Sequence, residues 1–241
     1  MVSALKAESQ TLYAHADNLD LRTSGMGGIA VENCLSKLSP KNIVGLISWG
    51  VCGALTPQLK PGDLVIPKAV MNESKKTIEC NNNWRNAILM SAQDSSQESD
   101  FIDSMIINSD AIVTSTDAKK KLADSSGADA VDMESYAIAS FADQHAIPFV
   151  VVRAVVDKLD DALPQASSFK PGQSAVSFST LLNSIARPLQ WPVLIRTGSK
   201  FNIALRQLTM FADTSIDALS FLGKPAIARL DKHANTQNDQ T

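Results

Sequence analysis

Apolar runs alternate with amphipathic helical patterns over most of the chain. Residues 43–48 and, apart from one arginine, 149–156 are almost continuously apolar, which is typical of parallel strands buried on both faces. This alternation predicts an α/β fold with a central, mostly parallel sheet. A third strand pattern, at 63–67, follows the turn signal Pro61-Gly62. A short strand pattern lies at 19–23, weaker ones lie at 105–107, 111–114 and 128–132, and helical patterns lie at 29–38, 83–92, 117–123 and 133–145.

The C-terminal part has a different pattern. After Trp191-Pro192-Val193-Leu194-Ile195, residues 201–222 repeat apolar positions at helical spacing. This predicts a long amphipathic helix that packs on the sheet or on a partner subunit, with a lipid contact as the alternative. We therefore expect a core domain over 1–190, an apolar helical extension over 191–230 and a disordered polar tail over 231–241.

Composition excludes several classes of protein. With 44% hydrophobic residues and a net charge of -3 over 241 residues, the chain is not predicted to be disordered. The charge balance gives no reason to expect a nucleic-acid partner, and 5% aromatic residues argue against stacking platforms for single strands. No apolar run approaches a membrane span and no signal peptide is visible, so we expect a cytoplasmic protein.

The three cysteines and a run of three lysines indicate structural rather than catalytic roles. Cys34, Cys52 and Cys80 match neither a zinc site nor a disulfide scaffold, so we expect reduced thiols, at least two of them buried, and no metal. Three consecutive lysines, Lys119 to Lys121, predict a solvated helix face. Residues 94–100 are polar and predict a surface loop.

A glycine loop offers the first candidate site. The sequence Ser24-Gly25-Met26-Gly27-Gly28-Ile29-Ala30 formally satisfies the dinucleotide fingerprint, which makes a nicotinamide-dependent oxidoreductase one alternative. That fingerprint expects an acid after the next strand, where this chain has Ser48-Trp49-Gly50. The loop is therefore either a tight turn or a place where backbone N–H groups approach a ligand. A second segment follows the 43–48 strand, and together the segments place four glycines at one crevice: Gly25, Gly27, Gly50 and Gly53.

Carboxylates follow the predicted strands. Glu134 comes after residues 128–131, and Asp157 follows the apolar run 149–156. Taken singly, Asp157 is explained as a helix N-cap or a turn acid, Glu134 as a first-turn acid and Glu8 as an exposed helix residue. Beside the glycine loops, they indicate a site for cleaving a glycosidic bond, with one carboxyl as acid, one activating the nucleophile and one orienting the sugar.

Five segments, in order, resemble the purine nucleoside phosphorylase and methylthioadenosine nucleosidase superfamily. This resemblance implies a three-layer sandwich around a mixed, mostly parallel sheet. The Ser-Trp-Gly variant, Val-Asp-Met-Glu-Ser and the Trp-Pro extension are most similar to the hopanoid-associated branch, whose members are assigned the removal of adenine from adenosylhopane. The segments are residues 4–8, 24–27, 47–55 with 60–63, 131–135 and 148–157.

The resemblance also implies residue roles. Asp157 would protonate N7 of the departing purine, Glu8 would activate water, and Glu134 would bind the ribose hydroxyls. Met133 would pack on the sugar. The other implied substrate-binding positions are Ser24, Gly25, Gly27, Ser48, Gly50, Cys52, Gly53, Ile112 and Val113, of which Cys52, Gly53, Ile112 and Val113 surround the base.

Departures from the family pattern decide the expected nucleophile. Phosphorolytic members carry an arginine where this chain has Ser48 and a serine where it has Val51, and both hold phosphate. With Glu8 present, we expect hydrolysis without a cofactor. Phosphorolysis, with phosphate as co-substrate held by Arg22 or Arg153, is one alternative, and a catalytically inactive nucleoside-binding protein is another. The family implies a homo-oligomer, and a lipidic substrate would add a loose membrane contact.

Overall fold

Two long strands form the centre of the molecule. The computed structural model describes residues 1–93, 104–161 and 191–220. Strands β3 (Leu46–Ala54) and β9 (Phe149–Asp157) pair in parallel over nearly their whole lengths, with a shift of register between Cys52 and Gly53. The prediction of a buried strand at 149–156 is confirmed. The strand predicted at 43–48 runs on to Ala54, so Gly50 and Gly53 lie inside β3 rather than after it.

The other described strands complete one mixed sheet. Their order is β2-β1-β3-β8-β7-β5-β6, with β9 beside β3 and β4 beside β9. The β3–β8, β4–β9 and β5–β6 pairs are antiparallel, and the remaining pairs are parallel. The strands are β1 (Val2–Ser3), β2 (Arg22–Thr23), β4 (Leu64–Val65), β5 (Ala69–Met71), β6 (Thr77–Glu79), β7 (Met105–Asn108) and β8 (Ala130–Asp132).

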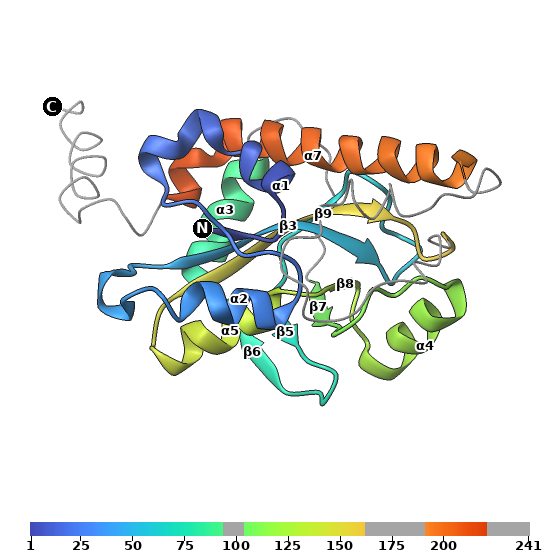
Figure 1. Ribbon diagram of the computed structural model, residues 1–241, viewed down its shortest axis with the longest axis horizontal. Helices are drawn as coiled ribbons and strands as arrows, with labels where there is room; N and C mark the ends of the chain where they lie inside the picture. The colour runs from blue at the N-terminus through green and yellow to red at the C-terminus, as the bar shows by residue number, and fades with distance from the viewer. Residues whose placement is uncertain (94–103, 162–190, 221–241) are drawn as a thin grey trace, which may run out of the picture.

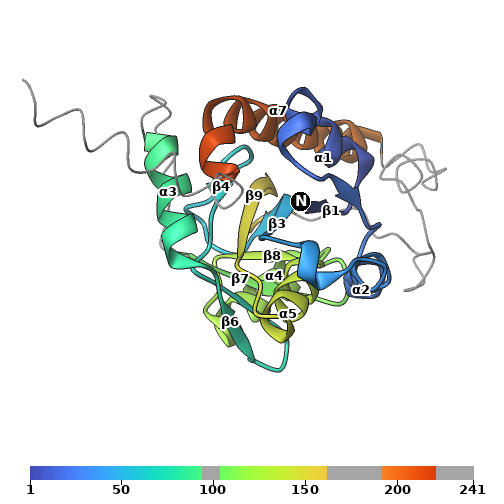
Figure 2. The same ribbon diagram turned by 90° about the vertical axis from the view of Figure 1, so that its left-hand side faces the viewer.

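Helices cover both faces of this sheet. Figures 1 and 2 show α1 and α7 on one face, and α2 and α5 on the other. The architecture is therefore the expected three-layer α/β sandwich. The described helices are α1 (Lys6–Gln10), α2 (Gly28–Leu35), α3 (Asn82–Gln93), α4 (Thr116–Ser126), α5 (Ser135–Gln144) and α7 (Trp191–Leu219), with short 3-10 turns at Tyr13–Asn18 and Pro40–Asn42.

Alternation of side chains along β3 produces two hydrophobic cores. Leu46 and Cys52 belong to the cluster that contains α2 and α5 residues such as Ile138. Ile47 and Trp49 point the other way and join a cluster with α7 residues. Because successive side chains of a strand point to opposite faces, a strand buried on both faces is apolar at nearly every position.

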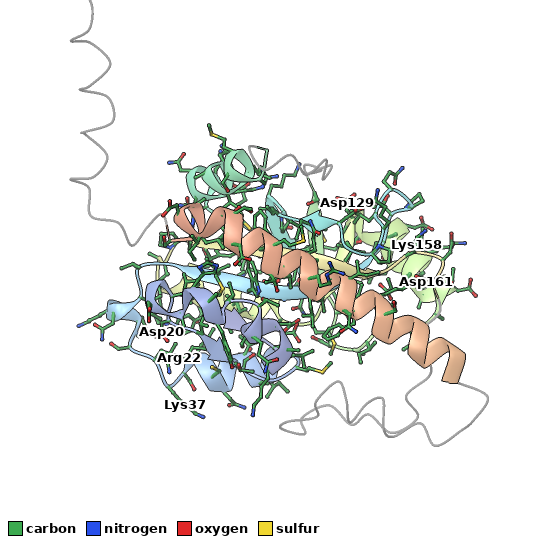
Figure 3. The ribbon with its side chains drawn as sticks, turned by 90° about the horizontal axis from the view of Figure 1, so that it is seen from above. Asp20, Arg22, Lys37, Asp129, Lys158 and Asp161 are labelled. Carbon is green, nitrogen blue, oxygen red and sulfur yellow. The ribbon has the colours of Figure 1, made fainter. Side chains whose placement is uncertain are left out.

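Helix α7 is part of the second core. Its Leu208 and Phe211 are fully buried, and the Phe211 ring stacks on Trp49 with centroids 6.3 Å apart. Trp84 of α3 donates a hydrogen bond to the carbonyl of Ala218 at 2.9 Å. Figure 3 shows α7 crossing the molecule above the strands. The prediction that the C-terminal helix packs on the sheet is confirmed, whereas the domain boundary at residue 190 stays a prediction.

Other sequence predictions were wrong or untested. Residues 111–114 form no strand, and the helix predicted from Met133 begins at Ser135. Cys52 and Cys80 are buried thiols, as predicted. The predicted loop at 94–100 and tail at 231–241 lie outside the described residues.

Replacing Phe211 with alanine tests the role of α7. The variant Phe211→Ala should lower the free energy of unfolding by about 3–5 kcal/mol, because it leaves a cavity against Trp49. Met210, on the same helix, is 45% exposed, and Met210→Ala should change stability by less than about 0.5 kcal/mol. Urea unfolding followed by circular dichroism measures both. Equal, small effects would show that α7 is not part of the core.

Candidate active site

Glu8 is a buried carboxyl anchored by backbone amides. It lies on α1 and is only 2% exposed, so the exposed-residue interpretation was wrong. Its Oε2 accepts the Leu5 N–H at 2.8 Å, and its Oε1 accepts the Val51 N–H at 3.0 Å. Burial raises the pKa of Glu8, while Arg153 and the two amides partly oppose that rise. The result is a fixed carboxyl, held against β3, with an increased affinity for a proton.

Arg153, from the middle of β9, is the centre of a buried polar network. Its Nη2 lies 2.7 Å from Asp132 Oδ2 and 3.9 Å from Glu134 Oε2. The same nitrogen donates to Ser48 Oγ at 2.8 Å and to Ser135 Oγ at 3.1 Å. Burial disfavours the charged guanidinium, but the surrounding carboxylates outweigh burial and raise its pKa. Arg153 therefore remains a cation inside the protein.

Gly50 makes room for this network. A Cβ atom added there would lie 2.5 Å from Glu8 Oε1 and still closer to Arg153 Nη1. The side chains of Glu8 and Arg153 therefore cross β3 at position 50, where nothing larger than a hydrogen atom fits. This is why a glycine stands inside an otherwise apolar strand.

Glu134 links the glycine loop to the network. The Gly27 N–H donates to Glu134 Oε1 at 2.7 Å, and Gly27 has a φ of 85°, a backbone conformation that favours glycine. Burial raises the pKa of Glu134 to about 7, against the opposing effect of Arg153, and Asp132 adds to the rise. A carboxylate at this amide repels the pyrophosphate that a dinucleotide would place there. The geometry therefore speaks against the nicotinamide alternative.

Asp157 lies at the end of β9, opposite Gly53 of β3. Its Oδ2 is 2.7 Å from Lys119 Nζ, and within the described ranges its Oδ1 has no hydrogen-bond partner. A Cβ atom at Gly53 would lie 2.9 Å from that Oδ1 and 3.3 Å from Val131. Burial raises the pKa of Asp157, and the Lys119 ammonium opposes that rise. Asp157 is thus a buried acid rather than a helix N-cap.

The two carboxyl groups stand at separate points of the same strand. Glu8 contacts β3 at Gly50 and Val51, and Asp157 contacts it at Gly53. Three residues of a strand span about 10 Å. The two carboxyl groups therefore contact β3 at different points along its length. Two buried carboxyl groups with a third nearby are the groups that acid–base cleavage of a glycosidic bond uses.

Residues 23–185 match the family described as the Phosphorylase superfamily. The chain belongs to this superfamily. Among curated proteins, a 5'-methylthioadenosine/S-adenosylhomocysteine nucleosidase of Buchnera aphidicola is 26% identical over 133 residues, a match covering 48% of this chain and 56% of the relative. The match thus spans little more than half the length of that relative.

Solved structures show the same fold. The 5'-methylthioadenosine/S-adenosylhomocysteine nucleosidase of Neisseria meningitidis, in complex with methylthio-immucillin-A, has a TM-score of 0.69 at 16% identity, covering 90% of this chain and 97% of that chain. The futalosine hydrolase of Helicobacter pylori has a TM-score of 0.67 at 15% identity, covering 90% and 95%. The resemblance seen in the sequence is confirmed at the level of the superfamily.

Within this superfamily fold, the remaining predicted residues take different places. The Gly25 N–H donates to the Ala4 carbonyl at 3.1 Å and Ser24 Oγ to the Ser3 carbonyl at 3.2 Å, which fastens the glycine loop beside α1. Ser48 is held by Arg153 inside the sheet.

The residues that the family resemblance places around the base and the sugar differ in their burial and surroundings. Cys52 lies within an apolar core, where burial raises the pKa of its thiol. Val113 packs on the small cluster around Val131, close to Asp157. Ile112 and Met133 are half-buried, and their roles stay predictions.

The two arginines suggested as phosphate ligands differ in exposure and in location. Arg22 is exposed and paired with Asp20 at 2.8 Å. Figure 3 shows that pair toward the opposite end of the molecule from Lys158 and Asp161, which follow Asp157 in the chain. Of these two arginines, only Arg153 lies in the site.

Lys119 is the site residue that the sequence interpretation missed. It is 1% exposed rather than part of a solvated face. The available signal was helical spacing: Lys119 precedes Leu122 and Ala123 by three and four residues, and both pack inward. Within the described ranges, no cluster of three or more His, Cys, Asp or Glu is placed to hold a metal ion. No described helix is long and apolar enough to cross a membrane.

The variant Gly50→Ala tests the close approach at β3. Its methyl group would displace Glu8 and Arg153, so the free energy of unfolding should fall by about 1–3 kcal/mol. Gly28→Ala is the control, because a Cβ there would lie 3.6 Å from the Ala137 Cβ, an ordinary contact. That variant should match or exceed the native stability by up to about 1 kcal/mol. Chemical denaturation compares them, and a fully stable Gly50→Ala protein would contradict the described geometry.

Proposed function

We propose that this protein hydrolyses the N-glycosidic bond of an adenine nucleoside that carries a substituent at its 5′ position. The observation that carries the proposal is the pair of buried carboxyl groups, Glu8 and Asp157, at two points of one strand with Glu134 beside them. The names of similar proteins support it: methylthioadenosine is a 5′-substituted adenine nucleoside, and its nucleosidases share this fold.

Each carboxyl group has a distinct task in this reaction. Asp157 gives its proton to the departing base as the bond from C1′ to nitrogen breaks and its electron pair moves to the base. A water molecule forms the new bond to C1′ and gives its proton to Glu8. Glu134 accepts hydrogen bonds from the ribose hydroxyls and so orients the sugar. The products are the free base and the free sugar.

The charges near Arg153 favour water over phosphate as the nucleophile. Arg153 is already shared by Asp132, Glu134 and Glu8, all of which raise its pKa. A phosphate arriving there would meet acidic groups and no additional cation from Ser48 or Val51. The Val51 N–H is also taken by Glu8. Phosphorolysis therefore remains the second candidate, supported by the presence of a buried arginine.

The finer proposal concerns the 5′ substituent. The sequence segments most similar to the hopanoid-associated branch favour adenosylhopane, a lipidic nucleoside. Helix α7 presents two exposed apolar side chains, Ile203 and Met210, seven residues apart on one face. Ile203 also contacts the turn at Gly62. These side chains offer a surface for a polycyclic tail or for a loose membrane contact.

Substitution of the two carboxyl groups tests the chemistry. With 5′-methylthioadenosine as substrate, Asp157→Asn and Glu8→Gln should each lower kcat by about 100- to 10,000-fold, because each removes a proton-transfer group. Asp160→Asn is the control, since the Asp160 side chain is 75% exposed and should leave turnover unchanged. Chromatography of released adenine measures the rates. Normal turnover by Asp157→Asn would refute its role, and nucleoside binding without any adenine release by the native protein would indicate a binding protein.

Isotope labelling distinguishes the two nucleophiles. In oxygen-18-labelled water, hydrolysis should place the label on C1 of the released sugar, and added phosphate should leave the rate unchanged. A sugar 1-phosphate product would instead establish phosphorolysis. Comparing kcat/KM for adenosylhopane and 5′-methylthioadenosine in the same preparation tests the finer proposal, which requires the lipidic nucleoside to be preferred.

A further inference from the structure

Lys119 is a buried lysine with two fixed contacts. Its Nζ lies 2.7 Å from Asp157 Oδ2 and donates to the Lys158 carbonyl, also at 2.7 Å. Lysine is almost never fully buried unless it is paired, because its ammonium loses hydration. The adjacent Lys120 shows the ordinary situation: its side chain is 54% exposed and lies 3.6 Å from Asp160. The burial of Lys119 therefore requires an explanation that its neighbour does not.

The position of Lys119 is set by contacts between α4 and the segment after β9. Thr116 at the start of α4 donates from Oγ1 to the Asp160 carbonyl at 3.3 Å. The Lys119 bond to the Lys158 carbonyl adds a second attachment. Figure 1 shows α4 beside the carboxyl ends of β3 and β9. These contacts hold the ammonium at one place on the Asp157 carboxyl group.

The contact makes the two oxygens of Asp157 unequal. Oδ2 faces the Lys119 ammonium, whereas Oδ1 lies beside Gly53 and has no hydrogen-bond partner in the part of the chain that the structure describes. An unpaired polar atom in a buried side chain is unfavourable unless a ligand or water completes it. Oδ1 is therefore the oxygen that remains available to a ligand or a water molecule.

We propose that Lys119 is the positioning residue of the general acid. It turns Oδ1 of Asp157 toward the base and stabilises the carboxylate that remains once the proton has moved to the base. Lys119 itself transfers no proton. This inference rests on the proposed function, in which Asp157 protonates the leaving base.

The charges around Asp157 support this role. Burial raises the pKa of Asp157, and Lys119 from α4 is the main group that lowers it. Asp161 from the following segment raises it, and a backbone hydrogen bond from Ala54 of β3 lowers it. Asp161 is itself ion-paired with Lys200 of α7. Cys52 of β3 faces the same groups as a neutral thiol, because burial raises its pKa. Lys119 is thus the cation that opposes desolvation and keeps the carboxyl able to release its proton.

Removal of Lys119 should change the pH dependence of activity in a definite direction. Without the ammonium, the pKa of Asp157 rises, so the carboxyl stays protonated to higher pH. The decline of kcat/KM on the alkaline side should move upward by about one pH unit or more. The plateau of kcat should fall by at least about 10-fold, because the weaker acid leaves an unpaired carboxylate after transfer. KM should change little.

The experiment compares Lys119→Met, Lys119→Arg and the control Lys120→Met. Activity toward 5′-methylthioadenosine is measured across pH, and the carboxyl stretching band that disappears in Asp157→Asn is titrated by infrared spectroscopy. In Lys119→Met, the alkaline decline of kcat/KM and the infrared titration of Asp157 should both move to higher pH. Lys119→Arg should restore both toward native values, and Lys120→Met should leave them unchanged. If Lys119→Met does not fold, Lys119→Gln is measured by the same criteria.

The outcomes separate this inference from the proposed function. A lower melting temperature with an unshifted alkaline decline of kcat/KM and an unshifted infrared titration would overturn the positioning role and leave only a structural one. Native kcat in Lys119→Met would also overturn it. If the native protein releases no adenine, the proposed function fails, and the infrared titration of Asp157 still reports whether Lys119 controls that carboxyl.

Discussion

The buried charge of Arg153 is the constraint on which the site depends. A guanidinium inside a sheet is tolerated only where carboxylates and hydroxyls surround it, because its lost hydration must be replaced. This protein takes those partners from three separate elements: Glu8 from α1, Asp132 from β8 and Glu134 from the start of α5. Meeting that requirement brings distant segments of the chain together, and the glycine at position 50 of β3 exists because two of the side chains cross there.

A buried cation lies near each of the proposed acid–base carboxyl groups: Arg153, shared with Asp132 and Glu134, near Glu8, and Lys119 beside Asp157. Glu8 is opposed by Arg153, and Asp157 is opposed by Lys119. Burial alone would turn both carboxyl groups into very weak acids, while full exposure would leave them ionised at neutral pH. In both groups burial raises the pKa and a nearby cation opposes that rise.

Sequence patterns located the two central strands and the acids, and named Arg153 as an alternative phosphate ligand, but they missed Lys119. Asp157 and Glu134 were identifiable because side chains at the carboxyl ends of strands gather at one edge of an α/β sheet. Lys119 was not, because a run of three lysines resembles a solvated face and its partner lies on another element. The extent of β3 was also missed, since Gly50 and Gly53 indicate a loop until the side chains that cross them are known. In both cases the missing information was tertiary contact rather than local preference.

The ion pair between Lys200 and Asp161 has a consequence for how the protein is made. It joins α7, near the end of the chain, to the segment that immediately follows Asp157. Trp49 likewise stacks on Phe211 of the same helix. During synthesis on a ribosome, the central strands emerge long before these partners do. The contacts of α7 with Trp49 and with the segment after Asp157 can therefore form only once residues 191–220 have left the exit tunnel.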